Sequence, residues 1–312
     1  TNNVNMHIFR YADMLLILEA PVPFSPPREC PAAGAKIVWV DNDPVQSRYK
    51  TMEFRADLWL PVGSAAAAQA IREAAEGMLS AGDLGRIAQR RVRLEQEKQE
   101  EVARQERLAL EAGHRRPMHP RWVGYQIGKI LQPDTILLND ALSNAEYVQA
   151  YYRTHRAGTY FRSGGSTGGW GPGAAVGAKL ASPDRDVVLA TGDGYFMFGT
   201  PLAALWAASH YRAGFLTVVF VNRSYSTGTV GLRRGFPEGY AVEAGNYEGG
   251  LFDPPPDFAK LAEAANGHGE TVSEPEEVAP ALQRGLAVAR TGVPALVAVM
   301  LPTLVEEMAA LR

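Results

Sequence analysis

The chain alternates between two hydrophobic patterns: continuous apolar runs, and stretches in which apolar residues recur at helical spacing. Short continuous runs are typical of strands buried on both faces of a parallel sheet. Two such runs, at residues 14–18 and 35–40, predict strands near the N-terminus, with a proline-rich loop at residues 21–27 between them. Four later strands are predicted at residues 135–138, 187–191, 216–221 and 295–301.

Helical patterns fill the intervals around the later strands. Strands that alternate with helices predict an α/β fold, in which a parallel sheet carries helices on both faces. Ligands of such sheets bind beyond the carboxyl ends of the strands, so the residues that follow each apolar run are the first candidates for function. The predicted helices span residues 122–131, 173–181, 201–213, 257–266 and 276–290.

A charged segment at residues 84–112 divides the chain. Pairs such as Arg93 and Glu97 are spaced to meet on one helical face. The alternation of both signs predicts an exposed connecting helix and argues against a nucleic-acid-binding one. We therefore expect three parts, at residues 1–62, 63–116 and 117–312.

Composition narrows the classes of function. With 312 residues, 46% hydrophobic and 21% charged, the chain can bury a substantial core. Its net charge of −3 provides no general basic field, which argues against nucleic acid as a partner. The single cysteine, Cys30, allows no internal disulfide and fits a reducing cytoplasm. The sequence has neither a long apolar run nor a signal-peptide pattern, so a cytoplasmic protein is expected.

Asp193 and Asn222 are the strongest candidates for chemistry. Asp193 lies between Gly192 and Gly194 directly after the run at residues 187–191, and 27 residues separate Gly194 from Asn222, which follows the next run. Mg²⁺ prefers oxygen ligands and takes several from phosphate and water, so a carboxylate and an amide at neighbouring strand ends suit it. Taken singly, the triplet is an ordinary turn and Asn222 a loop cap. The interval, filled by one helix and one strand, favours a metal–diphosphate site.

A second glycine-rich element spans residues 163–173 and leads into a helix of small residues. Such a loop exposes backbone amides and hydroxyls to an anion, and the small residues behind it allow close packing. A flexible linker is the alternative. Apolar structure on both sides, and Trp170 within the run, favour a binding loop.

Together these elements resemble the diphosphate-binding domain of thiamine-diphosphate enzymes, in the superfamily of acetolactate synthase, 2-oxoacid decarboxylases and benzoylformate decarboxylase. The similarity lies in residues 161–179, 189–225 and 257–272. Residues 14–60 resemble the last part of that family's Rossmann-like middle domain. The resemblance implies the C-terminal half of such an enzyme, with thiamine diphosphate and Mg²⁺ as cofactors.

The resemblance also assigns roles to residues. Asp193, the side chain of Asn222 and the carbonyl of Ser224 are the implied magnesium ligands. The residues expected at the cofactor are Asn139, Ser143, Ser163, Gly164, Ser166, Gly168, Gly192, Asp193, Gly194, Tyr195, Asn222, Ser224 and Tyr225.

Two positions depart from the family's pattern. Many members carry two adjacent asparagines where this chain has Val221 and Asn222, and only the second is required as a ligand. Gly168 stands where the family places a large aliphatic residue that bends the cofactor, so that its amino group reaches the reactive carbon. Either Thr167 or Trp170 takes over this role, or the loop is shifted, or activation is impaired.

Members of the family also need a pyrimidine-binding domain, whose glutamate protonates the cofactor. The segment before Met14 is too short to hold that domain. No catalytic residue is therefore expected in this chain, and the activating glutamate is expected from a partner polypeptide in a hetero-oligomer. The implied activity is decarboxylation of a 2-oxoacid or acetolactate-synthase-like carboligation; both stay open, because both domains contribute to specificity.

Other interpretations remain. A non-catalytic assembly or regulatory subunit of the same family is the main alternative. A nucleotide-binding oxidoreductase is disfavoured, because no convincing Gly-x-Gly-x-x-Gly lies between a strand and a helix. Arg233 and Arg234 follow a Gly/Ser/Thr-rich segment at residues 224–231, which suits closure over a site and contact with a carboxylate. Solvated loop arginines are the alternative there.

Overall fold

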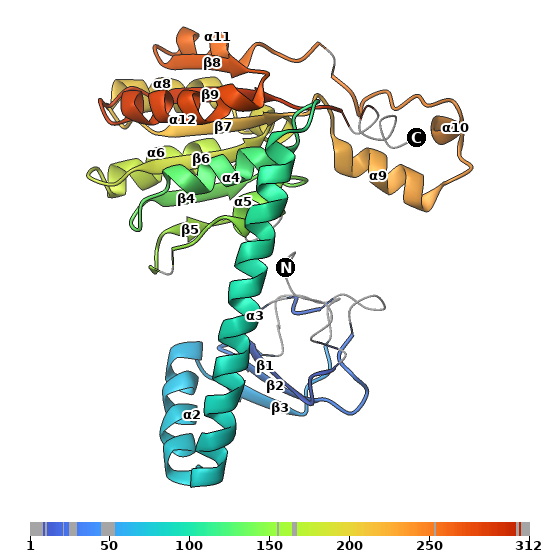
Figure 1. Ribbon diagram of the computed structural model, residues 1–312, viewed down its shortest axis with the longest axis vertical. Helices are drawn as coiled ribbons and strands as arrows, with labels where there is room; N and C mark the ends of the chain where they lie inside the picture. Colours follow the sequence, from blue (N-terminus) through green and yellow to red (C-terminus); the bar gives the residue numbers. More distant parts are fainter. Residues whose placement is uncertain are drawn as a thin grey trace. The chain divides into compact units, whose positions relative to one another are not determined.

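The computed structural model of the chain describes residues 9, 11–20, 22–24, 30–44, 54–154, 156–163, 167–252, 254–303 and 306. The chain forms two compact units, Thr1–Lys98 and Gln99–Arg312, and each is described by itself. The division between them falls within the long helix α3 (Ala81–Gly113), which matches the predicted charged helix (Figure 1). The expected boundaries at residues 62 and 116 stay a prediction.

The first unit contains a three-stranded parallel sheet in the order β1-β2-β3. Its core packs Leu15, Ile17, Ile37 and Trp39 on one face of the sheet. The opposite face of β1 carries side chains that are 40–55% exposed, so the prediction that this strand is buried on both faces is wrong. Among the described residues, no helix or strand fully covers the side chains of Met14, Leu16 and Leu18 on this face. The elements of this unit are β1 (Met14–Leu18), β2 (Lys36–Asp41), β3 (Leu58–Pro61) and α2 (Ser64–Met78), besides part of α3.

The second unit is built on a six-stranded sheet in the order β5-β4-β6-β7-β9-β8, and every neighbouring pair is parallel. The predicted α/β fold is thereby confirmed. The four predicted strands form its centre, and two further strands, β5 and β8, lie at its edges. The strands are β4 (Ile136–Asp140), β5 (Tyr160–Phe161), β6 (Val187–Gly192), β7 (Leu216–Val221), β8 (His268–Val272) and β9 (Ala295–Met300).

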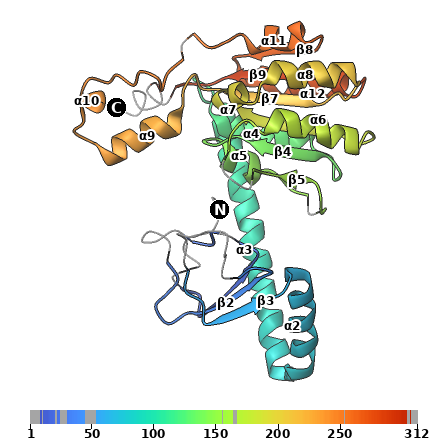
Figure 2. The same cartoon turned by 180° about the vertical axis from the view of Figure 1, so that it is seen from behind.

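Helices cover both faces of this sheet (Figures 1 and 2). Pro or acidic residues in the first turn mark the start of several of them, as at α12, which begins with Pro275 and carries Glu276 and Glu277. The helices are α4 (Pro120–Ile130), α5 (Ala145–Ala150), α6 (Gly171–Ala181), α7 (Asp193–Phe198), α8 (Pro201–His210), α9 (Ser226–Gly235), α10 (Tyr240–Glu243), α11 (Phe258–Ala264) and α12 (Pro275–Ala289). No helix in the described parts of the chain is both long and apolar enough to span a bilayer.

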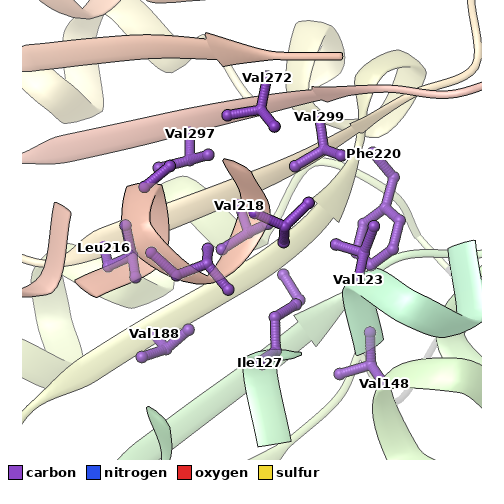
Figure 3. Close-up of a cluster of buried hydrophobic side chains, with 14 of the residues drawn as sticks. Val123, Ile127, Val148, Val188, Leu216, Val218, Phe220, Val272, Val297 and Val299 are labelled. Atoms are coloured by element: carbon purple, nitrogen blue, oxygen red, sulfur yellow. The ribbon is translucent and has the colours of Figure 1, made fainter. Parts of the chain in front are cut away.

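Two hydrophobic cores hold the helices against the sheet, because alternate residues of the central strands point to opposite faces. On one face Val188, Leu216, Val218 and Phe220 pack against α4, α5 and α12 (Figure 3). On the other face Leu189 and Val219 and their neighbours pack against α6, α7, α8 and α11. This two-sided burial fixes the carboxyl ends of β4, β6 and β7, from which the candidate site is built.

Candidate functional site

Asp193 and Asn222 lie at adjacent strand ends. β6 ends at Gly192 and β7 at Val221, and the two strands pair in parallel with Gly192 opposite Phe220. Both residues therefore leave the sheet at the same edge, as expected for the ligand-binding edge of an α/β sheet. The interval between them contains α7 and α8 rather than the single predicted helix.

The carboxyl group of Asp193 is buried, with a residue exposure of 2%, and its hydrogen bonds join the two loops. Oδ1 accepts the backbone N–H of Gly194 at 2.8 Å, and Oδ2 accepts that of Arg223 at 2.7 Å. Burial raises the pKa of Asp193 to about 6, and these backbone N–H groups act in the opposite direction. The raised pKa indicates a carboxylate that lacks full charge compensation from the protein.

Arg223 supplies its N–H from an unusual backbone conformation. Its φ of 56° lies in the left-handed region, which costs a residue with a side chain about 1–2 kcal/mol. Its guanidinium contacts Glu306 at 2.5 Å, and its carbonyl accepts the N–H of Phe252. Strained backbone of this kind persists where surrounding contacts fix it, often at functional sites.

A polar cluster orients Asn222 and Ser224. The Oδ1 atom of Asn222 accepts the N–H of Ser224 at 3.2 Å, and its Nδ2 donates to the hydroxyl of Ser226 at 3.0 Å. The hydroxyls of Ser224 and Ser226 lie 2.8 Å apart. Ser226 was not among the residues expected from the sequence, although it lies in the Gly/Ser/Thr-rich segment. That segment is helical rather than a loop, because α9 begins at Ser226.

A cavity of about 40 Å³ lies among these residues. It has room for about three water-sized groups, which suits a partly hydrated cation. Carboxylate, amide and carbonyl oxygens are the donors that Mg²⁺ prefers, so the residues present fit this ion. Nowhere in the described parts of the chain do three or more His, Cys, Asp or Glu side chains gather as a metal cluster. The lining residues that the sequence predicted are Ser143, Gly192, Asp193, Gly194, Tyr195, Asn222, Ser224 and Tyr225.

A larger cavity of about 380 Å³ adjoins the small one. The two share Ser143, Asn222, Ser226 and Thr227 in their linings. The larger cavity is otherwise lined by residues of four elements or their ends, and Arg234 of α9 is its basic residue. Its remaining lining residues are Pro120, Asn144, Tyr147, Val230, Gly231, Leu301 and Pro302.

The glycine-rich loop packs against α7. A Cβ atom at Gly168 would lie 2.2–2.4 Å from the ring of Tyr195, so that ring fills the space beside this glycine. Thr167 is exposed, and Trp170 is partly buried against the core on the α6 side of the sheet; whether either replaces the large aliphatic residue stays a prediction. Ser163 accepts the N–H of Thr167 at 3.3 Å. Gly164 and Ser166, both expected at the cofactor, lie outside the described residues.

Asn139 and Asp140 end β4, and the expected place of Asn139 at the cofactor stays a prediction. Asn139 is buried, donates to the carbonyl of Ala145 and the hydroxyl of Tyr160, and lines neither cavity described above. Its contacts hold the loop that carries Ser143. Asp140 was missed, although a carboxylate at the end of a buried strand is the same signal that identified Asp193.

Taken together, a parallel α/β sheet and a carboxylate–amide pair at neighbouring strand ends define a cofactor-binding domain. Residues 142–299 match the family model described as "Thiamine pyrophosphate enzyme, C-terminal TPP binding domain", and the chain belongs to this family. The resemblance identified from the sequence motifs is thereby confirmed.

Curated relatives are similar over different parts of the chain. The acetolactate synthase large subunit IlvG of Mycobacterium tuberculosis is 33% identical over 207 residues, which cover 64% of this chain and 35% of that protein. The benzoylformate decarboxylase of Pseudomonas aeruginosa is 29% identical over 282 residues, which cover 89% of this chain and 47% of that protein. The chain thus spans less than half the length of these relatives.

Solved structures show the same fold. The benzoylformate decarboxylase from Polynucleobacter necessarius superposes with a TM-score of 0.65 at 16% identity, over 93% of this chain and 49% of that one. The thiamine diphosphate-dependent 4-hydroxybenzoylformate decarboxylase of Rhodococcus jostii RHA1 gives 0.63 at 22% identity, with the same coverage. At these identities the likeness concerns the fold alone.

Proposed function

We propose that this chain supplies the metal–diphosphate half of the active site of a thiamine-diphosphate- and Mg²⁺-dependent enzyme that acts on a 2-oxoacid. The single observation that carries the proposal is the meeting of the buried Asp193 with Asn222 at a small cavity lined by oxygen donors. Family membership and relatives named as acetolactate synthase and benzoylformate decarboxylase support it. The reaction is decarboxylation, carboligation or both.

Each residue group has a defined task in this proposal. Asp193, the side chain of Asn222 and the carbonyl of Ser224 hold Mg²⁺, and Gly194 and Tyr195 face the diphosphate. Thiamine diphosphate supplies, when bound, a carbon nucleophile and an electron sink. Burial of the Asp193 carboxyl lowers the local dielectric and so strengthens its electrostatic attraction to the cation.

The larger cavity is proposed to take the 2-oxoacid. Val230, Leu301 and Pro302 offer apolar contact for a substrate side chain, and Arg234 offers a cationic partner for its carboxylate. Arg233 is the matched control, because it does not line the cavity. In the active assembly, Arg234→Gln is expected to raise KM for the 2-oxoacid about tenfold, whereas Arg233→Gln is expected to leave it within about twofold. Equal effects of both variants would refute this assignment.

We further propose that a partner polypeptide carries the pyrimidine-binding domain and the glutamate that activates the cofactor, in a hetero-oligomer. The motivating observation is that the alignments with these curated relatives cover less than half of each relative's length. Co-purification followed by mass spectrometry identifies the partner. Release of carbon dioxide from pyruvate is then expected only when both polypeptides are present, and full activity of this chain alone would refute the partner requirement.

Calorimetry with thiamine diphosphate and Mg²⁺ tests the metal site. Wild-type protein is expected to bind, Asp193→Ala to lose binding by at least about a hundredfold, and the exposed Asp184→Ala to bind normally. Absence of binding to the wild type, with and without the partner, would overturn the catalytic proposal. Binding without turnover in the complete assembly would favour the alternative, a non-catalytic assembly or regulatory subunit.

A further inference from the structure

Asp140 is a buried carboxylate that the proposed chemistry does not use. It is the last residue of β4, and its exposure is 3%. Its Oδ2 atom accepts the backbone N–H groups of Gly169 and Gly171, each at 3.1 Å. No described residue donates a hydrogen bond to its buried Oδ1 atom. A buried carboxylate with this limited compensation is costly, so its position calls for an explanation other than stability.

The contacts of Asp140 tie the glycine-rich loop to the strand end. Gly171 begins the eleven-residue helix α6, whose first amides have no partner within the helix. A Cβ atom at Gly171 would lie 2.9 Å from Oδ2 of Asp140 and 2.6 Å from the side chain of Leu189. The close approach of carboxylate and loop therefore requires glycine at this position.

The same loop segment contacts α7 on its other side. A Cβ atom at Gly169, whose φ is 90°, would lie 2.7 Å from the backbone nitrogen of Gly199. A Cβ atom at Gly199 would in turn lie 2.6 Å from the carbonyl oxygen of Gly169, and Gly168 faces the ring of Tyr195. The loop is thus held between Asp140 and the helix that begins with Asp193.

We propose that Asp140 is a positioning residue of the cofactor site: by accepting the Gly169 and Gly171 amides it fixes the glycine-rich loop against α7, and so sets the placement of Tyr195 relative to Asp193. The effect on cofactor binding rests on the proposed function. The effect on the loop and on α7 does not, because it concerns contacts within the free protein.

Hydrogen exchange of the free full-length chain tests the positioning directly. Asp140→Ala is expected to speed exchange about tenfold in residues 167–175 and also in α7, while β9 keeps its protection. Asp140→Asn retains one oxygen that can accept both amides, so its exchange is expected to stay within about threefold of wild type. Faster exchange in the loop alone, or an Asn variant that behaves like Ala, would overturn the proposal.

A second variant covers the case in which Asp140→Ala unfolds and exchange rises throughout the chain. Gly171→Ala leaves the carboxylate in place but forces the loop away from it, so the same paired increase in residues 167–175 and α7 is expected. Protection of α7 unchanged in this variant would overturn the proposal. Asp184→Ala, at an exposed position of the same unit, is the control.

Calorimetry with thiamine diphosphate and Mg²⁺ adds the functional readout. The dissociation constant is expected to rise about tenfold in Asp140→Ala and less than about threefold in Asp140→Asn. A wild type that binds no cofactor would refute the proposed function and leave the exchange result to decide the role of Asp140. Binding that is equal in wild type and Asp140→Ala would refute the link from the loop to the cofactor.

Discussion

Replacing Asp140 with asparagine is expected to stabilise the free protein at neutral pH and to leave its stability in mild acid unchanged. Burial raises the pKa of Asp140 from 3.8 to about 6, against the opposite effect of the Gly171 and Gly169 amides. The folded protein therefore holds this proton more tightly than the unfolded chain does. Its stability consequently falls as pH rises between about 4 and 6, and the full penalty is present above about 7.

The magnitude follows from the two pKa values. At about 1.4 kcal/mol for each factor of ten in proton affinity, the charged carboxylate lowers the free energy of unfolding by about 3 kcal/mol above pH 7. Asparagine keeps one oxygen for both glycine amides and places its NH₂ where Oδ1 of Asp140 lies without a donor among the described residues. One unpartnered polar group thus replaces another, so the main change is the removal of the charge.

The assay is urea unfolding of wild type and Asp140→Asn at several pH values, with hydrogen-exchange labelling of β6 and β7 to report on the second unit. The gain in the free energy of unfolding is expected to grow from none at about pH 4 to about 3 kcal/mol at about pH 7.5. Asp184→Asn, at an exposed position, provides the baseline. A gain that is the same at both pH values, or a loss at the higher one, would show that burial of the charge is not the cause.

Three further outcomes are expected. The pKa of Asp193 is about 6, and its carboxyl group must be ionised to bind a cation. The Mg²⁺ affinity measured in titrations is therefore expected to fall about tenfold per pH unit below about pH 6. An affinity that does not change with pH would exclude Asp193 as a ligand. Phe220→Ala removes a fully buried ring and should lower the free energy of unfolding by about 3–5 kcal/mol in urea. Gly269→Ala would place a Cβ atom 2.1 Å from the carbonyl oxygen of Ala259 and is expected to lower the free energy of unfolding by about 1–3 kcal/mol. Gly177→Ala is the control, because a Cβ atom there meets open space on a helix and is expected to cause no loss. Similar melting temperatures for the two variants would contradict the packing argument.

The central sheet could be predicted from sequence because its strands are apolar on both faces. β6 and β7 are buried along almost their whole length, and the polar residues that follow them, Asp193 and Asn222, mark the candidate functional edge. The edge strands escaped prediction for the opposite reason. β5 has two residues and β8 has mostly half-buried polar ones, so their existence depends on pairing with β4 and β9 rather than on a local pattern.

The missed parts of the site depend on contacts between distant segments. α9 is a helix although Gly, Ser and Thr fill its first turns, a composition that favours loops in isolation. The space beside Gly168 is taken by Tyr195 of α7, and no local pattern encodes that contact. Asp140 follows an apolar run as Asp193 does, yet only the fold shows that the glycine-rich loop returns to it.

The residues that line both cavities have a consequence for how the substrate specificity of this protein can evolve. Thr227 and Ser226 border both spaces, whereas Val230 and Arg234 border only the larger one. If the small cavity holds the proposed cation and the larger one the proposed substrate, a substitution in the shared lining alters both environments at once, and selection for a new substrate there is constrained by retention of the cation. Val230 is free of that constraint, whereas Arg234 is retained as the proposed partner of the carboxylate that every 2-oxoacid carries, so we expect new specificities to arise at Val230.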